Sequence, residues 1–190
     1  MANLYARQQG EGKPLILIHG FPLHQAVWND FASRLVNSFK VITIDLPGFG
    51  KSAILPHPFS LDQVADQLNH YLSDERIING TVIGHSLGGY VALAMIKKRP
   101  DLFSAVGLFH STAYADKTKK KESRNKVIEF VEKNGPLPFA TNFISPLFAH
   151  PGNPQIERVR RIASESSKDA IIGYTMAMRD RPDQTKTLKT

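Results

Sequence analysis

The sequence contains no cysteine among its 190 residues. A disulfide scaffold, a thiolate metal site and a cysteine nucleophile are therefore excluded. Its seven histidines form no H-E-x-x-H pattern, and the sequence has no clustered set of carboxylates beside them. We therefore expect no metal centre.

Long hydrophobic runs are absent as well. The apolar runs at residues 15–18 and 91–96 are far shorter than the roughly 20 residues that a membrane-spanning helix needs. The first 20 residues lack the charged, apolar and small-residue regions of a signal peptide. We therefore expect no membrane partner and a cytoplasmic location.

Acidic residues are fewer than basic ones, 17 against 24, which gives a net charge of +7. Much of the excess lies in one run of basic side chains: Lys117, Lys119, Lys120, Lys121, Arg124 and Lys126. This run has no interleaved aromatic residues and matches no nucleic-acid-binding module. We interpret it as a solvated helix face that could attract acidic substrates weakly, and we expect no nucleic-acid partner.

Short apolar strands alternate with helical patterns in the first part of the chain. Strands are predicted at residues 15–19, 41–45, 81–84 and 105–109, with a weaker strand pattern at 3–8. Helical spacing is found at residues 26–36, after a Ser60–Gln63 capping box, and at 87–99. This alternation predicts an α/β fold with a doubly wound, mostly parallel sheet.

From residue 116 onward the pattern predicts helices alone, at about residues 117–134, 139–148, 153–167 and 168–181. The glycine–proline pairs at 135–136 and 151–152 separate the first three of them. The sequence therefore divides into an α/β part, residues 1–112, and a helical part, residues 113–190.

The strongest chemical signal is the G-x-S-x-G motif formed by Gly84, Ser86 and Gly88. It follows a predicted strand and opens a predicted helix, which is the context that a nucleophile elbow requires. So sharp a turn holds the serine in a strained backbone conformation and leaves no space for side chains at the two glycines. The motif predicts that Ser86 is a nucleophile at a helix N-terminus, where the helix dipole favours negative charge.

Acyl transfer also needs donors for the oxyanion that develops on the substrate. In this geometry one donor is the backbone N–H after the nucleophile, here that of Leu87. The second comes from the loop after an earlier strand, which points to the N–H of Phe21 in the sequence His-Gly-Phe-Pro at 19–22. Pro22 has no N–H to offer.

Three motifs together resemble the α/β-hydrolase fold, and within it the small esterase-like members with a helical cap. They are residues 19–22, the Asp-Leu-Pro-Gly-Phe-Gly-Lys-Ser sequence at 45–52, and the elbow at 84–89. The resemblance implies that residues 113–190 are the cap. Dehalogenases and epoxide hydrolases of this fold carry Asp at the elbow, so Ser86 implies a small carboxylic ester as substrate and an acyl-enzyme intermediate.

The resemblance also suggests which other residues surround the substrate. His110 ends the strand expected beside that of Ser86, so it is a candidate for lining the pocket. His19, Gly20 and His85 are further candidates for substrate binding, although the side chain of His85 is expected to point away from Ser86. In the cap, four residues are candidates for an apolar lining or for cap core: Phe139, Phe143, Phe148 and Met176.

The catalytic acid and histidine of such a triad are not found in this chain. The resemblance places them after two further strands beyond the cap, and we expect those C-terminal strands to be missing. Asp116, His110 and His150 are poor substitutes, since Asp116 and His150 belong to the cap region. We therefore expect the 190-residue chain alone to be inactive and the strand at 105–109 to be an exposed edge. A complementing C-terminal segment or self-association through that edge would cover it.

Two apparent nucleotide motifs fail. Residues 48–53 fit G-x-G-x-x-A, but Pro56 and Pro58 prevent the helix that should follow. The P-loop pattern that would end at Ser52 has Asp45 where its first glycine is required. We expect no cofactor. A non-catalytic binding protein of this fold, and an acyltransferase, lactonase or perhydrolase with the same serine elbow, remain alternative functions.

Overall fold

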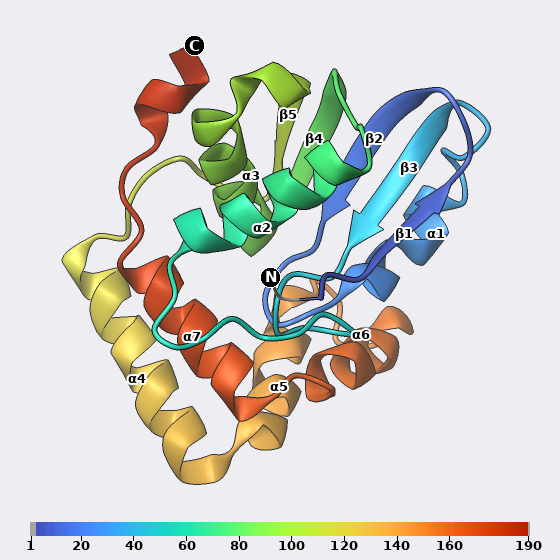
Figure 1. Ribbon diagram of the computed structural model, residues 1–190. Helices are drawn as coiled ribbons and strands as arrows, with labels where there is room; N and C mark the ends of the chain where they lie inside the picture. Colours follow the sequence, from blue (N-terminus) through green and yellow to red (C-terminus); the bar gives the residue numbers. More distant parts are fainter. Residues whose placement is uncertain (1–2, 190) are drawn as a thin grey trace.

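The computed structural model describes residues 3–189. Five strands form one sheet in the order β1-β3-β2-β4-β5 (Figure 1). β1 runs antiparallel to β3, and every other neighbouring pair is parallel. The strands are β1 (Ala6–Gln9), β2 (Lys13–Ile18), β3 (Phe39–Ile44), β4 (Gly80–His85) and β5 (Phe103–Phe109). The prediction of an α/β fold with a mostly parallel sheet is confirmed.

Helices pack on both faces of this sheet and at one of its ends. They are α1 (Asn29–Ala32), α2 (Leu61–Asp74), α3 (Leu87–Lys98), α4 (Thr118–Asn134), α5 (Pro136–Ile144), α6 (Gln155–Ser164) and α7 (Lys168–Arg179), with the 3-10 turns η1 (Gln25–Trp28), η2 (Pro100–Leu102), η3 (Ser145–Leu147) and η4 (Thr185–Lys189).

Alternate residues of β2 enter two different hydrophobic clusters. Leu15 and Leu17 pack with Trp28 of η1 on one face of the sheet. Ile16 and Ile18 belong to the main cluster, which includes the buried faces of α2 and α3. Successive side chains of a strand point to opposite faces, so the strand can be apolar throughout. Figure 1 shows α2 and α3 on the near face and α1 on the far one.

The two helices on the near face begin as the sequence predicts. Ser60 Oγ accepts a hydrogen bond from the N–H of Gln63 at 3.2 Å, and Gln63 Oε1 accepts one from the N–H of Ser60 at 2.8 Å. This capping box satisfies two donors at the start of α2. α3 is buried continuously from Val91 to Met95, in agreement with its apolar sequence.

The prediction of one helix over residues 26–36 is wrong, because the regular helix found there is shorter. The structure has η1, one turn of α1, and then turns closed by i to i+3 bonds, among them Leu35 N to Ala32 O at 2.9 Å. Ser33 Oγ also donates to the carbonyl of Asp30 at 3.0 Å. Asn, Asp and Ser side chains compete for backbone groups in this way, so they shorten helices that the apolar spacing alone would extend.

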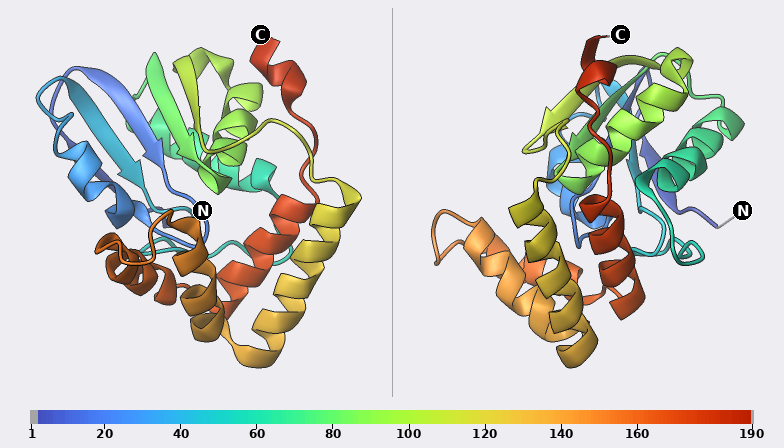
Figure 2. Two further views of the ribbon diagram at one scale, coloured as in Figure 1. Left: turned by 180° about the vertical axis from the view of Figure 1, so that it is seen from behind. Right: turned by 90° about the vertical axis from the view of Figure 1, so that its left-hand side faces the viewer.

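Every regular element after residue 112 among the described residues is helical. The helices α4–α7, called the cap helices below, gather at the carboxyl ends of β2 and β3 (Figures 1 and 2). α4 packs on α7, and α5 packs on α6. Val131, Phe139 and Tyr174 from these helices share the main hydrophobic cluster with the sheet. The division at residue 112 stays a prediction, because the cap helices and the sheet have this core in common.

β5 lies at one edge of the sheet. Among the described residues it pairs with β4 alone, and Ser104, Ala105 and Phe109 are exposed. Further strands beyond this edge, and a segment that would cover it, stay predictions. No helix within residues 3–189 is long and apolar enough to cross a membrane.

A buried ion pair anchors both ends of the cap region to α3. Asp116 Oδ1 lies 2.8 Å from Arg181 Nη1, and the two side chains are only 5% and 6% exposed. Asp116 Oδ2 also accepts a hydrogen bond from Arg124 Nε of α4 at 3.1 Å. Arg181 donates to the carbonyls of Met178 and Tyr114, and its guanidinium lies 3.9 Å from the ring centre of Tyr90 in α3. This network joins the segments that enter and leave the cap to one core helix.

Removing one partner of this pair should destabilise the fold strongly. We expect Arg181→Met to lower the free energy of unfolding by about 3 kcal/mol, because Asp116 is left as a buried, partly unpaired charge. Urea unfolding measures the effect. The matched control is Arg99→Met, which breaks the exposed pair with Asp101 and should change stability little. Equal losses in the two variants would contradict the anchoring role.

Candidate active site

The turn between β4 and α3 holds Ser86 in a strained conformation with φ 51° and ψ −111°. This φ lies in the region that non-glycine residues rarely adopt. A Cβ on Gly84 would lie 2.2 Å from the carbonyl oxygen of Gly88, and a Cβ on Gly88 would lie 2.4 Å from that of Ile18. Both glycines are therefore required for the chain to pass so closely.

Neighbouring backbone and one side chain hold Ser86 in place. Its N–H donates to the carbonyl of Phe109 at 2.9 Å. Its carbonyl accepts from Ser111 Oγ at 2.7 Å and from the N–H of Gly89 at 3.0 Å. Sequence reasoning did not find Ser111; its only signal is a small polar residue shortly after a strand.

Two backbone N–H groups near this turn have no acceptor among the described residues. They belong to Phe21, in the loop after β2, and to Leu87, the first residue of α3. The first N–H groups of a helix have no partner within the helix. The two donors predicted for an oxyanion are therefore both free.

Ser86 opens into a cavity of about 450 Å³. The core contributes two imidazoles, His85 and His110, and the cap helices close the other side with apolar side chains. The lining is Phe21, Leu23, Val27, His85, Ser86, His110, Phe143, Ile144, Leu147, Phe148 and Val159. None of these residues is acidic, and none is a lysine or arginine.

Two of the four cap residues proposed for the lining lie elsewhere. Phe143 and Phe148 line the cavity. Phe139 is 6% exposed and stacks on Phe143, with ring centres 5.2 Å apart, so it belongs to the cap core. Met176 lines a second cavity on another side of the molecule.

His19 is fully buried and does not line the cavity, in contrast to its expected place at the substrate. Its Nε2 accepts a hydrogen bond from the N–H of Leu46 at 2.9 Å, so Nδ1 carries the proton and lies 3.0 Å from the carbonyl of Gly20. Burial lowers its pKa from 6.5 to about 3, and the ring is neutral. His19 ties together the loops after β2 and β3.

Gly20 also lies outside the cavity lining, packed beneath it. A Cβ on this residue would lie 2.6 Å from His85 Nδ1. Gly20 therefore makes room for the imidazole of His85. This imidazole does line the cavity, although the sequence predicts that it points away from Ser86.

The two cavity imidazoles lie close together, with ring centres 6.4 Å apart. Burial lowers the pKa of His85, and the neighbouring His110 lowers it further. Among the described residues, no hydrogen bond joins Ser86 Oγ to either ring, and no carboxylate orients them. The geometry brings nucleophile and imidazoles to one cavity without assembling a serine–histidine–acid chain.

The remaining triad substitutes are not at the cavity. Asp116 is held by Arg124 and Arg181, which leaves its carboxylate committed to the cap anchor. His150 is exposed in the turn before α6. Groups of three or more potential metal ligands are absent from residues 3–189.

Comparison with known proteins agrees with this architecture. The family model described as "Alpha/beta hydrolase family" matches residues 15–185. The chain belongs to the alpha/beta hydrolase family. Among solved structures, an esterase from Thermogutta terrifontis with bound malate is similar over 97% of this chain and 70% of its own, at 31% identity and a TM-score of 0.88.

Two curated relatives match over different lengths. A pimeloyl-[acyl-carrier protein] methyl ester esterase from Vibrio vulnificus (strain YJ016) is 38% identical over 102 residues, which is 54% of this chain and 38% of that protein. An (E)-2-((N-methylformamido)methylene)succinate hydrolase from Acinetobacter baylyi is 27% identical over 90% of this chain and 64% of its own length. The matched part of the chain thus spans less than two thirds of either relative.

The buried His19 predicts how stability depends on pH. Its pKa is about 3 in the folded chain and near 6.5 when unfolded. A lowered folded pKa gives stability that is complete above pH 6.5 and is lost as the pH falls from 6.5 towards 3. At pH 5 the loss from this group should be about 2 kcal/mol.

Urea unfolding at pH 7.5 and pH 5 measures this loss. The substituted side chain in His19→Asn cannot titrate, so the difference in the free energy of unfolding between pH 7.5 and pH 5 should shrink by about 2 kcal/mol. This holds whatever the stability of the variant at pH 7.5. In the control His150→Asn, which replaces an exposed histidine, it should stay as in the parent chain. An unchanged pH dependence in His19→Asn would contradict the assignment.

Proposed function

We propose that this alpha/beta hydrolase cleaves small carboxylic esters by way of an acyl-enzyme on Ser86. The observation that carries the proposal is the strained Ser86 at the start of α3, beside the free N–H groups of Phe21 and Leu87 and open to a cavity. Strained backbone of this kind is typical of a functional site. The esterase and hydrolase names of its relatives support the same class.

In the proposed reaction, Ser86 Oγ attacks the carbonyl carbon of the ester and loses its proton to a base. The carbonyl oxygen becomes an oxyanion that accepts hydrogen bonds from the N–H groups of Phe21 and Leu87. The C–O bond to the alcohol then breaks, and the alcohol leaves with a proton. Water attacks the acyl-Ser86 ester, which releases the carboxylic acid and restores the hydroxyl.

Residues 3–189 do not place a base where it could take the proton from Ser86. Ser86 has no hydrogen-bonded imidazole among them, and His85 and His110 have no carboxylate partner. A serine hydroxyl needs such a base to become a good nucleophile. We therefore propose that the base acts from a histidine supplied by another segment. The same observation favours a second candidate, a binding protein of this fold without catalysis.

The cavity favours an ester with an uncharged, apolar acyl or alkyl group. Its lining contains apolar side chains from the core and cap together with the two imidazoles, and no lysine or arginine. A carboxylate on the substrate would be desolvated there without a cation to pair with. The succinate in the name of the Acinetobacter baylyi relative is therefore a poor model for a substrate of this site.

Added imidazole should replace the absent base and reveal the nucleophile. The 190-residue chain is treated with a fluorophosphonate probe and measured by intact-mass spectrometry. Without imidazole it should show little adduct, and with imidazole it should show one adduct per chain. The rate of adduct formation should reach a plateau as the imidazole concentration rises. Ser86→Ala should abolish the adduct, and the control Ser33→Ala, on the exposed surface, should keep it.

Two results would contradict parts of this proposal. No adduct at Ser86 even with imidazole would favour the binding protein. A fast adduct without imidazole would show that His85 or His110 already serves as the base, and would overturn the proposal that another segment supplies it.

The apolar lining predicts selectivity between probes. In the presence of imidazole, an alkyl fluorophosphonate should react with Ser86 about tenfold faster than one of equal length ending in a carboxylate, because the carboxylate is desolvated without a partner. Leu147→Arg places a cation at the cavity rim, where Leu147 is 62% exposed, and should reduce the difference. The matched control is Leu188→Arg, at an exposed leucine outside this cavity. Equal rates for the two probes on the parent chain would contradict the apolar specificity.

A further inference from the structure

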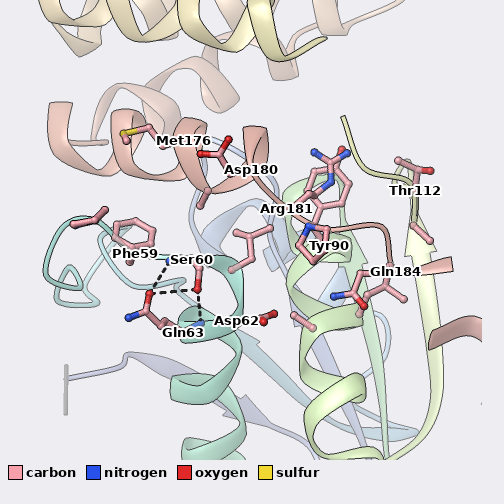
Figure 3. A pocket seen from close by; sticks show the side chains of 17 residues that line it. Phe59, Ser60, Asp62, Gln63, Tyr90, Thr112, Met176, Asp180, Arg181 and Gln184 are labelled. Carbon is pink, nitrogen blue, oxygen red and sulfur yellow. Dashed lines mark hydrogen bonds between the residues drawn. The ribbon is translucent and has the colours of Figure 1, made fainter. Parts of the chain in front are cut away.

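A second cavity lies on the other side of the segment that enters the cap. Its volume is about 360 Å³, which is within the range of small-molecule sites. The first turn of α2, the middle of α3, the end of α7 and residues 180–184 surround it (Figure 3). None of its lining residues belongs to the Ser86 cavity.

The body of this cavity is apolar. Phe59 before α2, Leu93 of α3 and Met176 of α7 line it together. Figure 3 shows Phe59 beside the start of α2 and Met176 above it on α7. Such walls suit an aromatic or branched aliphatic group.

One buried polar side chain points into the cavity with an unused donor. Gln184 is 8% exposed, and its Oε1 accepts a hydrogen bond from Thr187 Oγ1 at 2.9 Å. Its side-chain nitrogen has no acceptor among the described residues, and Figure 3 shows it beside α3. A ligand with a carbonyl oxygen would give this donor an acceptor.

The uncompensated charge at the cavity is negative. Asp62, in the first turn of α2, has no ion pair or hydrogen bond within residues 3–189. The other charged lining residues are already neutralised, since Arg181 pairs with Asp116 and Asp180 pairs with Arg179. The start of α2 offers an anion little, because the N–H of Gln63 already donates to Ser60.

We propose that this second cavity binds an α-amino amide with an apolar side chain, the chemistry found at the N-terminus of an apolar peptide. The ammonium group lies at Asp62, the carbonyl oxygen accepts from Gln184, and the side chain packs on Phe59, Leu93 and Met176. A free amino acid fits less well, because its carboxylate would approach Asp62. The site is independent of the ester chemistry proposed for Ser86.

Calorimetric titration of the Ser86→Ala chain tests the proposal without any catalytic step. L-phenylalaninamide should bind with a dissociation constant in the millimolar range. Two analogues should each bind about fivefold more weakly. They are 3-phenylpropanamide, which lacks the ammonium group, and phenethylamine, which lacks the carbonyl group. L-phenylalanine should bind more weakly than its amide.

Two variants locate the ligand. Asp62→Asn should weaken phenylalaninamide about fivefold and leave 3-phenylpropanamide unchanged, because only the former carries a charge. Gln184→Leu should weaken both. The matched control is Asp169→Asn, which removes a carboxylate from the first turn of α7 outside the cavity and should change neither affinity.

Three outcomes would overturn the proposal. The first is no binding of phenylalaninamide at concentrations up to 20-fold above a millimolar dissociation constant. The others are equal effects of Asp62→Asn and Asp169→Asn on affinity, or a crystal structure with the amide in the Ser86 cavity. If Asp62→Asn or Gln184→Leu does not fold, the order of affinities among the four probes on the parent chain still decides. Phenylalaninamide no tighter than phenethylamine would then contradict the role of Gln184.

Discussion

The close approach of α3 to the ends of β2 and β4 is the constraint on which the candidate active site depends. The first turn of α3 passes so near the carbonyl of Ile18 that even a methyl group on Gly88 would overlap it. Close packing at this point places the helix N-terminus directly above two parallel strands. Ser86 has to adopt its positive φ there because the chain must turn within one residue. The nucleophile is thus positioned by backbone that has no freedom to relax.

Buried polar groups extend this constraint into the neighbouring loops. Asp45, 1% exposed, accepts hydrogen bonds from the N–H groups of Gln25 at 2.7 Å and Lys51 at 2.9 Å. His19 uses both ring nitrogens on backbone groups beside it. Buried polar side chains stabilise a fold when they are fully satisfied, and these two hold the loop that carries Phe21. His19 and Asp45, which belong to two of the three sequence motifs, therefore support the loops beneath the cavity and do not line it.

The sequence could predict what depends on local backbone. The G-x-S-x-G turn, the Ser60–Gln63 capping box and the alternating faces of β2 follow from short-range sterics and strand or helix period, and the structure shows all three. The family resemblance implies that residues 113–190 form a cap, and this division stays a prediction. Predictions failed where distant segments decide the outcome. Whether His19 or His85 faces the cavity depends on the loop after β3. Ser111 offered no pattern at all.

The cap helices are attached to the core by different kinds of contact on their two sides. At α7, Arg181 and Asp116 form a buried pair with several further hydrogen bonds. At α6, the contact to the core includes an exposed ion pair between Arg158 and Asp30. Exposed pairs contribute little, whereas breaking a buried one leaves a charge without a partner. The α5–α6 pair, which closes the Ser86 cavity, is held mainly by apolar packing, since Ala140, Ile144 and Ile162 form a buried cluster with Leu23 of the core. The cap is thus fixed by a buried ion pair beside α7 and by a hydrophobic contact at α5 and α6, and the latter contact adjoins the Ser86 cavity.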